Sequence, residues 1–73
     1  MSWKEDVLSV IRENYSVGDI FNLQDIYSYN NHFKSIYSNN NNIEAKVRQT
    51  LQYLRNDGIL EFVDDNGTFR LLK

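Results

Sequence analysis

The amino-acid sequence predicts an α+β fold, a single domain spanning residues 1–73 with three helices, a short strand and a C-terminal β-hairpin. Two observations lead to this prediction. Before Gly58, apolar residues recur at helical spacing in three separate segments. After Gly58 the apolar period changes to two, and Asn66-Gly67, a strong hairpin signal, stands between two alternating stretches.

The first helix is predicted over residues 3–13. Ser2 and Glu5 form an S-x-x-E pattern, in which both side chains can satisfy free backbone amides at a helix start. The apolar residues of this segment fall on one face, with the tryptophan as a core anchor: Trp3, Val7, Val10 and Ile11. Gly18 marks the break after the helix, and Ile20-Phe21 is long enough for a short strand.

The second helix is predicted over residues 23–37. Asn22 is a good N-cap, and Asp25 places an acid in the first turn. The apolar residues recur at helical intervals: Leu23, Ile26, Tyr27, Phe33, Ile36 and Tyr37. Asn30-Asn31 in the middle are weak helix formers but can face solvent. Residues 38–41 predict a turn, because short polar side chains compete for the backbone.

The third helix is predicted from near Asn42 to Asp57, and Gly58 stands at the favoured left-handed C′ position. Its apolar stripe consists of Ile43, Val47, Leu51 and Leu54. Two alternating segments then flank the turn at residues 64–67, and they predict the strands of a hairpin. The order of helix, short strand, helix, turn, helix and hairpin is that of a winged helix-turn-helix domain, with the hairpin as the wing.

Composition excludes several classes of site. The chain has no cysteine, so disulfides and thiolate metal sites are excluded, and its one histidine, His32, cannot hold a metal by itself. The sequence has no Gly-rich phosphate loop and no nucleophile with a base nearby, so we expect no cofactor and no catalytic activity. Asp64 and Asp65 are expected to be turn residues. No segment has the length of a membrane span or the pattern of a signal peptide, and we expect a soluble, cytoplasmic protein.

The charge is distributed unevenly. The net charge of −2 argues against indiscriminate binding to nucleic acids. Residues 39–56, however, carry three basic side chains and one acid, a local charge of +2, while the rest of the chain carries −4. The face of the third helix that is predicted to be exposed bears the following side chains: Ala45, Lys46, Arg48, Gln49, Gln52 and Asn56.

These residue types are suited to reading duplex DNA. An arginine can donate two hydrogen bonds to guanine, a glutamine can pair with adenine, and an alanine lets the helix approach the bases. Asn41 and Asn42 stand at the helix N-terminus, the end that enters the major groove most deeply in helix-turn-helix proteins. The sequence therefore predicts binding to double-stranded DNA through the third helix and its preceding turn, with the acidic hairpin tip held away from the duplex.

Two alternative functions remain open. Any exposed helix face is polar, and the acidic wing at Asp64-Asp65 together with the negative net charge favours a winged helix that binds another protein. A transcriptional regulator domain would share the DNA-binding surface, but it should ignore methylation and usually acts as a dimer. Steep salt dependence of duplex binding is expected of a DNA reader and not of a protein adaptor.

Residues 43–62, IEAKVRQTLQYLRNDGILEF, resemble the pattern I-x-x-K-[IV]-R-Q-x-L-Q-x-L-R-[DN]-x-G-[IL]-[IL]-E-F. This pattern belongs to the C-terminal winged-helix domain of methyl-directed restriction endonucleases of the DpnI and Dam-replacing type. Residues 21–27, FNLQDIY, are similar to the entry of that domain into its second helix, and Phe69-Arg70-Leu71 is similar to its closing strand. The resemblance covers nearly the whole chain from Trp3.

The resemblance implies a domain that binds double-stranded DNA and reads adenine-methylated GATC sites, while a nuclease domain in the same or a partner chain performs metal-dependent cleavage. We expect the domain to be a monomer. The resemblance implies DNA contacts at Lys46, Arg48, Gln49 and Gln52, with Asn41 and Asn42 at the helix entry. We expect the Ala45 region to help form a small apolar pocket for the methyl group. Two segments depart from the family: Tyr37-Ser38 replaces a frequent His-Pro, and the wing Asp64–Gly67 is longer and more acidic than the frequent Gly-Arg-Gly.

Overall fold

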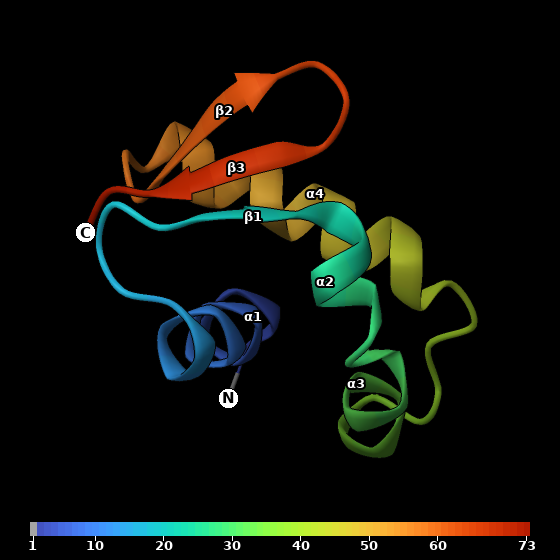
Figure 1. The fold of residues 1–73 in the computed structure, drawn as a ribbon. Coiled ribbons are helices and arrows are strands. Elements are labelled where there is room, and N and C mark those ends of the chain that lie inside the picture. The colour runs from blue at the N-terminus through green and yellow to red at the C-terminus, as the bar shows by residue number, and fades with distance from the viewer. Residues whose placement is uncertain (1) are drawn as a thin grey trace.

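A three-stranded antiparallel sheet packs against a group of helices in the structure, a computed structural model that describes residues 2–73 (Figure 1). The elements in chain order are α1 (Trp3–Asn14), β1 (Ile20–Asn22), α2 (Leu23–Tyr27), α3 (Asn30–Ile36), α4 (Ile43–Asn56), β2 (Leu60–Asp64) and β3 (Thr68–Leu71). The α+β fold of a winged helix-turn-helix is confirmed, with β2, β3 and their loop as the wing. No helix within residues 2–73 has the length and apolar character needed to cross a membrane.

The sheet has the strand order β1-β3-β2, so the short strand predicted from Ile20-Phe21 pairs with the second strand of the hairpin. Phe69 on β3 lies opposite Phe21 on one side and Phe62 on the other, with ring centroids 5.5 and 5.1 Å apart. Aromatic neighbours across strands stabilise a sheet of this size. These rings fix the wing to the body of the domain.

The hairpin loop has three residues between the paired positions Asp64 and Thr68. Of its residues only Gly67 has a positive φ, of +83°, and the Asp64 side chain caps the turn by accepting from the backbone amides of Asn66 and Thr68. A two-residue loop of the Asn-Gly kind needs positive φ at both positions, so the loop is of the longer, bulged type. The predicted hairpin and the role of Asp64 as a turn residue are confirmed.

The hydrophobic core is formed between α1, α4 and the inner face of the sheet. The predicted stripes are confirmed, since the following side chains are buried: Val7, Val10 and Ile11 from α1, and Val47, Leu51 and Leu54 from α4. Trp3 packs against this core as expected, and its ring stacks on Tyr37 at 4.2 Å between centroids. Thr50 is also buried, and its hydroxyl donates to the backbone oxygen of Lys46 at 2.7 Å, so the polar group is satisfied.

The prediction of one continuous helix over residues 23–37 is wrong, because the segment is divided into α2 and α3. The Ser28 hydroxyl donates to the backbone oxygen of Asp25 at 2.6 Å, and Tyr29 leaves the helical region with φ −97° and ψ 12°. Such local side-chain bonds compete with helix continuation. Asn31 is exposed, whereas Asn30 is half-buried and its side-chain amide donates to the Glu44 carboxylate at the start of α4.

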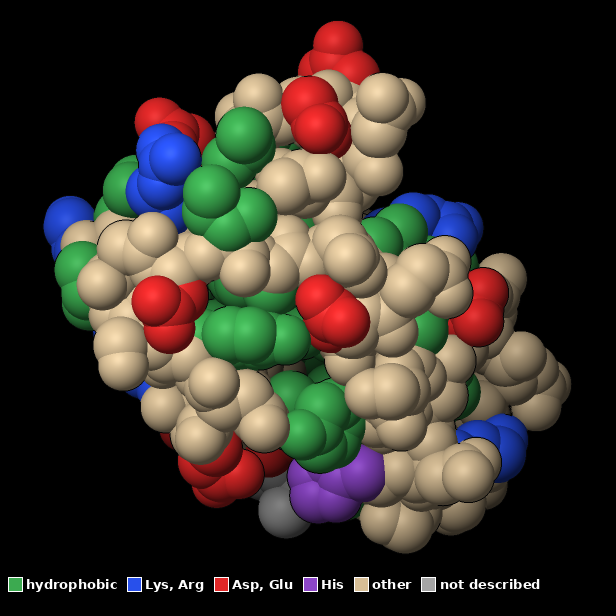
Figure 2. Space-filling view, viewed as in Figure 1, with side chains coloured by type: hydrophobic (Ala, Val, Ile, Leu, Met, Phe, Trp, Pro, Cys, Tyr) green, Lys and Arg blue, Asp and Glu red, His purple; other side chains and the backbone are tan. Residues whose placement is uncertain are grey.

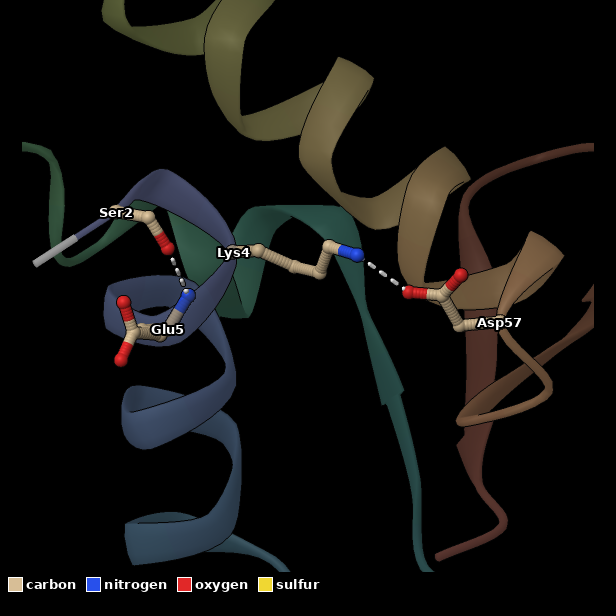
Figure 3. Close-up of polar contacts among 4 residues, drawn as sticks. All are labelled: Ser2, Lys4, Glu5 and Asp57. Atoms are coloured by element: carbon tan, nitrogen blue, oxygen red, sulfur yellow. Dashed lines mark hydrogen bonds and ion pairs between the residues drawn. The ribbon is translucent and has the colours of Figure 1, made fainter.

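An ion pair joins the first turn of α1 to the end of α4 (Figure 3). Ser2 caps α1 by accepting from the amide of Glu5, as predicted, and the Lys4 ammonium reaches Asp57 at 2.6 Å. Asp57 is the C-cap of α4, where a negative charge opposes the helix dipole. Lys4 offsets this charge and ties α1 to the end of α4.

Candidate nucleic-acid interface

The orientation of α4 is fixed at both ends and along one side. Asn42 is its N-cap, with the side-chain oxygen accepting from the Ala45 amide, and the Asn40 side chain accepts in turn from the Asn42 amide at 2.9 Å. At the other end, Gly58 has the left-handed φ of +76° that was predicted. Because the stripe ending at Leu54 is buried, the opposite side of the helix must face outward.

The exposed side of α4 lines a groove of about 600 Å³ between the helix and the wing. We call it the α4–wing groove. Its helix wall consists of Ala45, Arg48, Gln49 and Gln52; its wing wall consists of Asp64, Asp65 and Gly67; its floor consists of Leu23, Leu51, Phe62 and Phe69. Four of the seven predicted DNA-binding residues are therefore brought to one surface.

Arg48, Gln49 and Gln52 are exposed, as predicted, and none of them is covered by α1 or the hairpin. The Arg48 guanidinium donates to the Tyr27 hydroxyl of α2 at 2.9 Å, and the Lys46 ammonium donates to the Gln49 side-chain oxygen at 3.2 Å. Guanidinium and carboxamide groups on one helix face match the donors and acceptors of base edges in the major groove. Contact of these side chains with DNA stays a prediction.

The remaining predicted residues lie at the N-terminal end of α4. A second hollow, of about 350 Å³, is lined there by Asn40, Asn42, Ala45, Lys46 and Gln49. Asn41 is exposed in the turn that precedes the helix. Ala45 and Gln49 line both hollows, so the two surfaces are continuous along α4.

The wing wall has the opposite chemistry. Figure 2 shows acidic side chains around the hairpin loop at the top of the view, over the segment that joins β2 and β3 in Figure 1. Arg70, the basic side chain of β3, is paired with Glu61 of the adjacent strand at 2.6 Å. The sequence predicted an acidic wing, but it did not place the Asp64 and Asp65 side chains on the same groove as Arg48.

Sequence reasoning missed two residues at this surface. Tyr27 was predicted only as part of an apolar stripe, and its ring does pack against the core, but its hydroxyl also reaches Arg48. Asn40 was predicted only as a turn residue, and it also supports the cap of α4. Tyr27 is half-buried, so its ring and its hydroxyl have different environments. A tyrosine at the edge of an apolar stripe is a signal for such a role, since its polar tip needs a partner.

Titratable groups with shifted pKa lie outside the groove. Burial, together with a hydrogen bond to the Asp6 carboxylate, raises the pKa of Tyr37 to about 12, and burial raises the pKa of Tyr15. Among residues 2–73 no group of three or more His, Cys, Asp or Glu side chains could hold a metal ion. His32 is exposed on α3 beside the Phe33 ring. The shifted groups therefore belong to the packing of α1 against its neighbours.

Comparison with known protein families identifies the family of this chain. The family model described as the Dam-replacing HTH domain matches residues 1–70 of this 73-residue chain. The match includes α4, the turn before it and the wing up to Arg70, so both walls of the α4–wing groove lie within it.

Proposed function

The chain belongs to the Dam-replacing HTH domain family, and from that membership we propose that it is the reading domain of a methyl-directed restriction system, recognising GATC-type duplexes through α4. A helix-turn-helix domain is a DNA-binding module that is not catalytic by itself. One observation carries the proposal for this chain. Arg48, Gln49 and Gln52 project together from α4, and the opposite side of the helix is anchored in the core.

The spacing of these side chains suits successive base pairs. Arg48 and Gln52 are four residues apart, which is about 6 Å along a helix at 1.5 Å per residue. Stacked bases of B-DNA are spaced by about 3.4 Å, so the two side chains can address base pairs one or two steps apart. Arginine suits guanine and glutamine suits adenine, which are the two purines of a GATC site.

Recognition of N6-methyladenine needs an apolar surface beside these polar groups. The α4–wing groove offers one, because the half-buried Leu23 and Phe62 line it together with the small side chain of Ala45. Burial of one methyl group contributes about 0.8 kcal/mol, close to a fourfold gain in affinity. A fully methylated site with one such contact on each strand is therefore expected to be preferred by about fifteenfold.

In this proposal the domain reads DNA and a separate nuclease domain, in the same or a partner chain, performs the cleavage in the cytoplasm. Support for a monomeric reader comes from the groove itself, since one chain supplies both of its walls. The Asn40–Asn42 turn supplies backbone and side-chain amides at the helix entry, where phosphate groups are attracted by the helix N-terminus.

The test is equilibrium binding of the domain to labelled duplexes with methylated GATC, unmethylated GATC or a scrambled site, each at two salt concentrations. We expect affinity to fall steeply with salt, methylated GATC to bind most tightly, and Arg48→Ala to reduce both the affinity and the salt slope. Arg12→Ala is the matched control, because Arg12 lies on α1 and donates to the backbone oxygen of Lys73. Absence of binding to every duplex at low salt would overturn the proposal.

The protein-interaction function has one specific observation in its favour, which is the placement of Asp64 and Asp65 on the groove wall. An acidic wall suits a basic peptide better than a phosphate backbone. The same experiment separates the two functions, because a protein adaptor shows no duplex binding near physiological salt. Equal affinity for methylated and unmethylated GATC would instead favour a transcriptional regulator domain.

A further inference from the structure

Tyr27, the last residue of α2, makes a direct side-chain link to the polar face of α4. Its hydroxyl oxygen accepts from the Arg48 guanidinium at 2.9 Å, across a sequence separation of 21 residues. The ring packs against the hydrophobic core, so the position of the hydroxyl is set by buried contacts. Arg48 itself is exposed and lines the α4–wing groove. A tyrosine whose ring is held by the core thus contacts the guanidinium of an exposed arginine.

The hydroxyl of Tyr27 and the guanidinium of Arg48 keep hydrogen-bond donors that a ligand can use. A tyrosine hydroxyl has one hydrogen to donate and lone pairs to accept, and a guanidinium has five N–H donors. The Tyr27–Arg48 bond uses one lone pair of the hydroxyl and one N–H of the guanidinium. Within residues 2–73 the Tyr27 O–H donates to no acceptor. The pair therefore presents the phenolic hydrogen and further guanidinium hydrogens side by side.

We propose that Tyr27 is a positioning residue for DNA reading, whose hydroxyl donates to a backbone phosphate oxygen next to the base pair that Arg48 contacts. This inference rests on the proposed function. In helix-turn-helix proteins the helix before the recognition helix crosses the DNA backbone, and that place is taken here by α2 and α3. A phenol donating to a phosphate oxygen makes a short, charge-assisted hydrogen bond. It fixes the register of the protein on the duplex while the same oxygen restrains Arg48.

Loss of a neutral phosphate donor affects the salt dependence of duplex binding differently from loss of a basic side chain. Basic side chains release counterions when they bind phosphates, so their removal reduces the salt dependence of binding. Tyr27 is not a basic side chain, so its loss should lower the affinity and leave the salt slope unchanged. Because Arg48 would also lose its restraint, discrimination between GATC and a scrambled site should decrease.

The experiment compares the wild-type domain with Tyr27→Phe, Arg48→Ala and the double variant, measuring affinity for methylated GATC and scrambled duplexes over a range of salt. We expect Tyr27→Phe to bind methylated GATC about fivefold more weakly with an unchanged salt slope and a smaller ratio of specific to scrambled binding. The double variant should be weaker than Arg48→Ala alone, but by less than fivefold, because the restraint of Arg48 involves both residues whereas the phosphate bond of Tyr27 does not. Tyr15→Phe is the matched control, since Tyr15 does not line the α4–wing groove and its ring stacks on Phe21 of β1, the edge strand on the other side of β3 from β2.

The outcomes separate this inference from the proposed function. If the wild-type domain binds no duplex, the proposed function itself fails. If the wild type binds and Tyr27→Phe retains its affinity and its discrimination, only the role of Tyr27 is overturned. A salt slope that decreases in Tyr27→Phe as much as in Arg48→Ala also overturns it, since that would indicate a displaced Arg48 without a neutral phosphate donor. Melting temperatures of both variants close to wild type confirm that folding is retained.

Discussion

The two walls of the α4–wing groove differ in how they are held and in what they offer to a ligand. The α4 wall is one side of a 14-residue helix whose other side is buried and whose ends are capped. The wing wall is a loop held by the Asp64 turn and by one backbone bond, from the Leu23 amide to the Gly67 oxygen at 2.8 Å. The helix presents hydrogen-bond donors, and the wing presents carboxylates. The comparison indicates that α4 attracts a polyanion such as DNA, whereas the carboxylates of the wing repel it.

The largest effect is expected from removing the buried support of the helix wall. Leu51 is 1% exposed, and Leu51→Ala should lower the free energy of unfolding by about 2–5 kcal/mol, because a cavity is left in the core. The stability margin of such a small domain is of that order, so the variant should be largely unfolded at room temperature. Circular dichroism during thermal unfolding measures the effect.

The matched control for this prediction lies on β2 of the wing, outside the groove lining. Val63 on β2 is 42% exposed, and Val63→Ala should change the free energy of unfolding by no more than about 0.5 kcal/mol. A melting temperature for Leu51→Ala close to that of Val63→Ala would show that α4 does not depend on the core for its position.

The second prediction tests how the wing wall is held. Gly67 has φ +83°, and an added Cβ would lie 3.2 Å from the Leu23 Cβ, where the wing meets α2. Gly67→Ala should cost about 1–2 kcal/mol for the left-handed backbone, with a further cost for the contact. Gly58 at the end of α4 has φ +76°, but its Cβ would meet only the flexible end of Lys73 at 3.8 Å.

Gly58→Ala should therefore cost less than Gly67→Ala, and both can be measured by urea unfolding. The two glycines have similar backbone angles, so the difference between the variants isolates the contact between the wing and Leu23. Equal losses of stability would show that this contact does not hold the wing wall in place.

The helix wall could be predicted from sequence, and the wing wall only in part. The stripe and caps of α4 are local features, since Asn42, Gly58 and the apolar residues between them lie within one segment. The division of residues 23–37 could not be predicted from periodicity, because Ile26 and Phe33 are seven residues apart, nearly two turns, and share a face in a continuous helix as well. The break depends on the Ser28 hydroxyl, whose bond to Asp25 periodicity does not show.

The groove required information from distant parts of the chain. Asp64 and Asp65 were predicted as turn residues, but their place opposite Arg48 follows from the bond between Leu23 and Gly67 and from pairing of β1 with β3. The Tyr27–Arg48 bond likewise joins two elements that are separate in sequence. A single sequence indicates which side chains each element exposes, whereas tertiary packing determines which of these surfaces lie against each other.

The third prediction concerns the charge of the wing. Asp65 is exposed on the groove wall, so Asp65→Asn should strengthen duplex binding by removing repulsion of phosphates. For one exposed charge within about a Debye length, the expected gain is about twofold to fivefold at low salt and smaller at physiological salt. The gain should be larger for a scrambled duplex in relative terms, because specific binding also depends on base contacts from α4.

Fluorescence anisotropy of labelled duplexes checks this prediction, with Glu13→Gln as the control for the same change in net charge. Glu13 is an exposed residue of α1 that does not line the groove. Equal gains for the two variants would indicate that only net charge matters. That result would remove the distinction between the two walls.

The smallest effect on DNA binding is expected at a site remote from both walls. A change there should alter the stability of the domain and leave its duplex affinity unchanged. The Tyr37 hydroxyl donates to Asp6, and its pKa is raised to about 12 from a usual value of about 10 by burial and this bond. A raised pKa means that the neutral phenol is favoured in the folded state, so its contribution to stability is complete below about pH 10 and is lost as the pH rises through 12. The melting temperature of the wild type should therefore decline between pH 9 and 12, and this decline should be shallower in Tyr37→Phe. Part of the decline should remain in the variant, because the pKa of Tyr15 is also raised. Duplex affinity at neutral pH should be the same in both proteins, since Tyr37 lies outside the α4–wing groove; an equally steep alkaline decline in Tyr37→Phe would show that other groups control it.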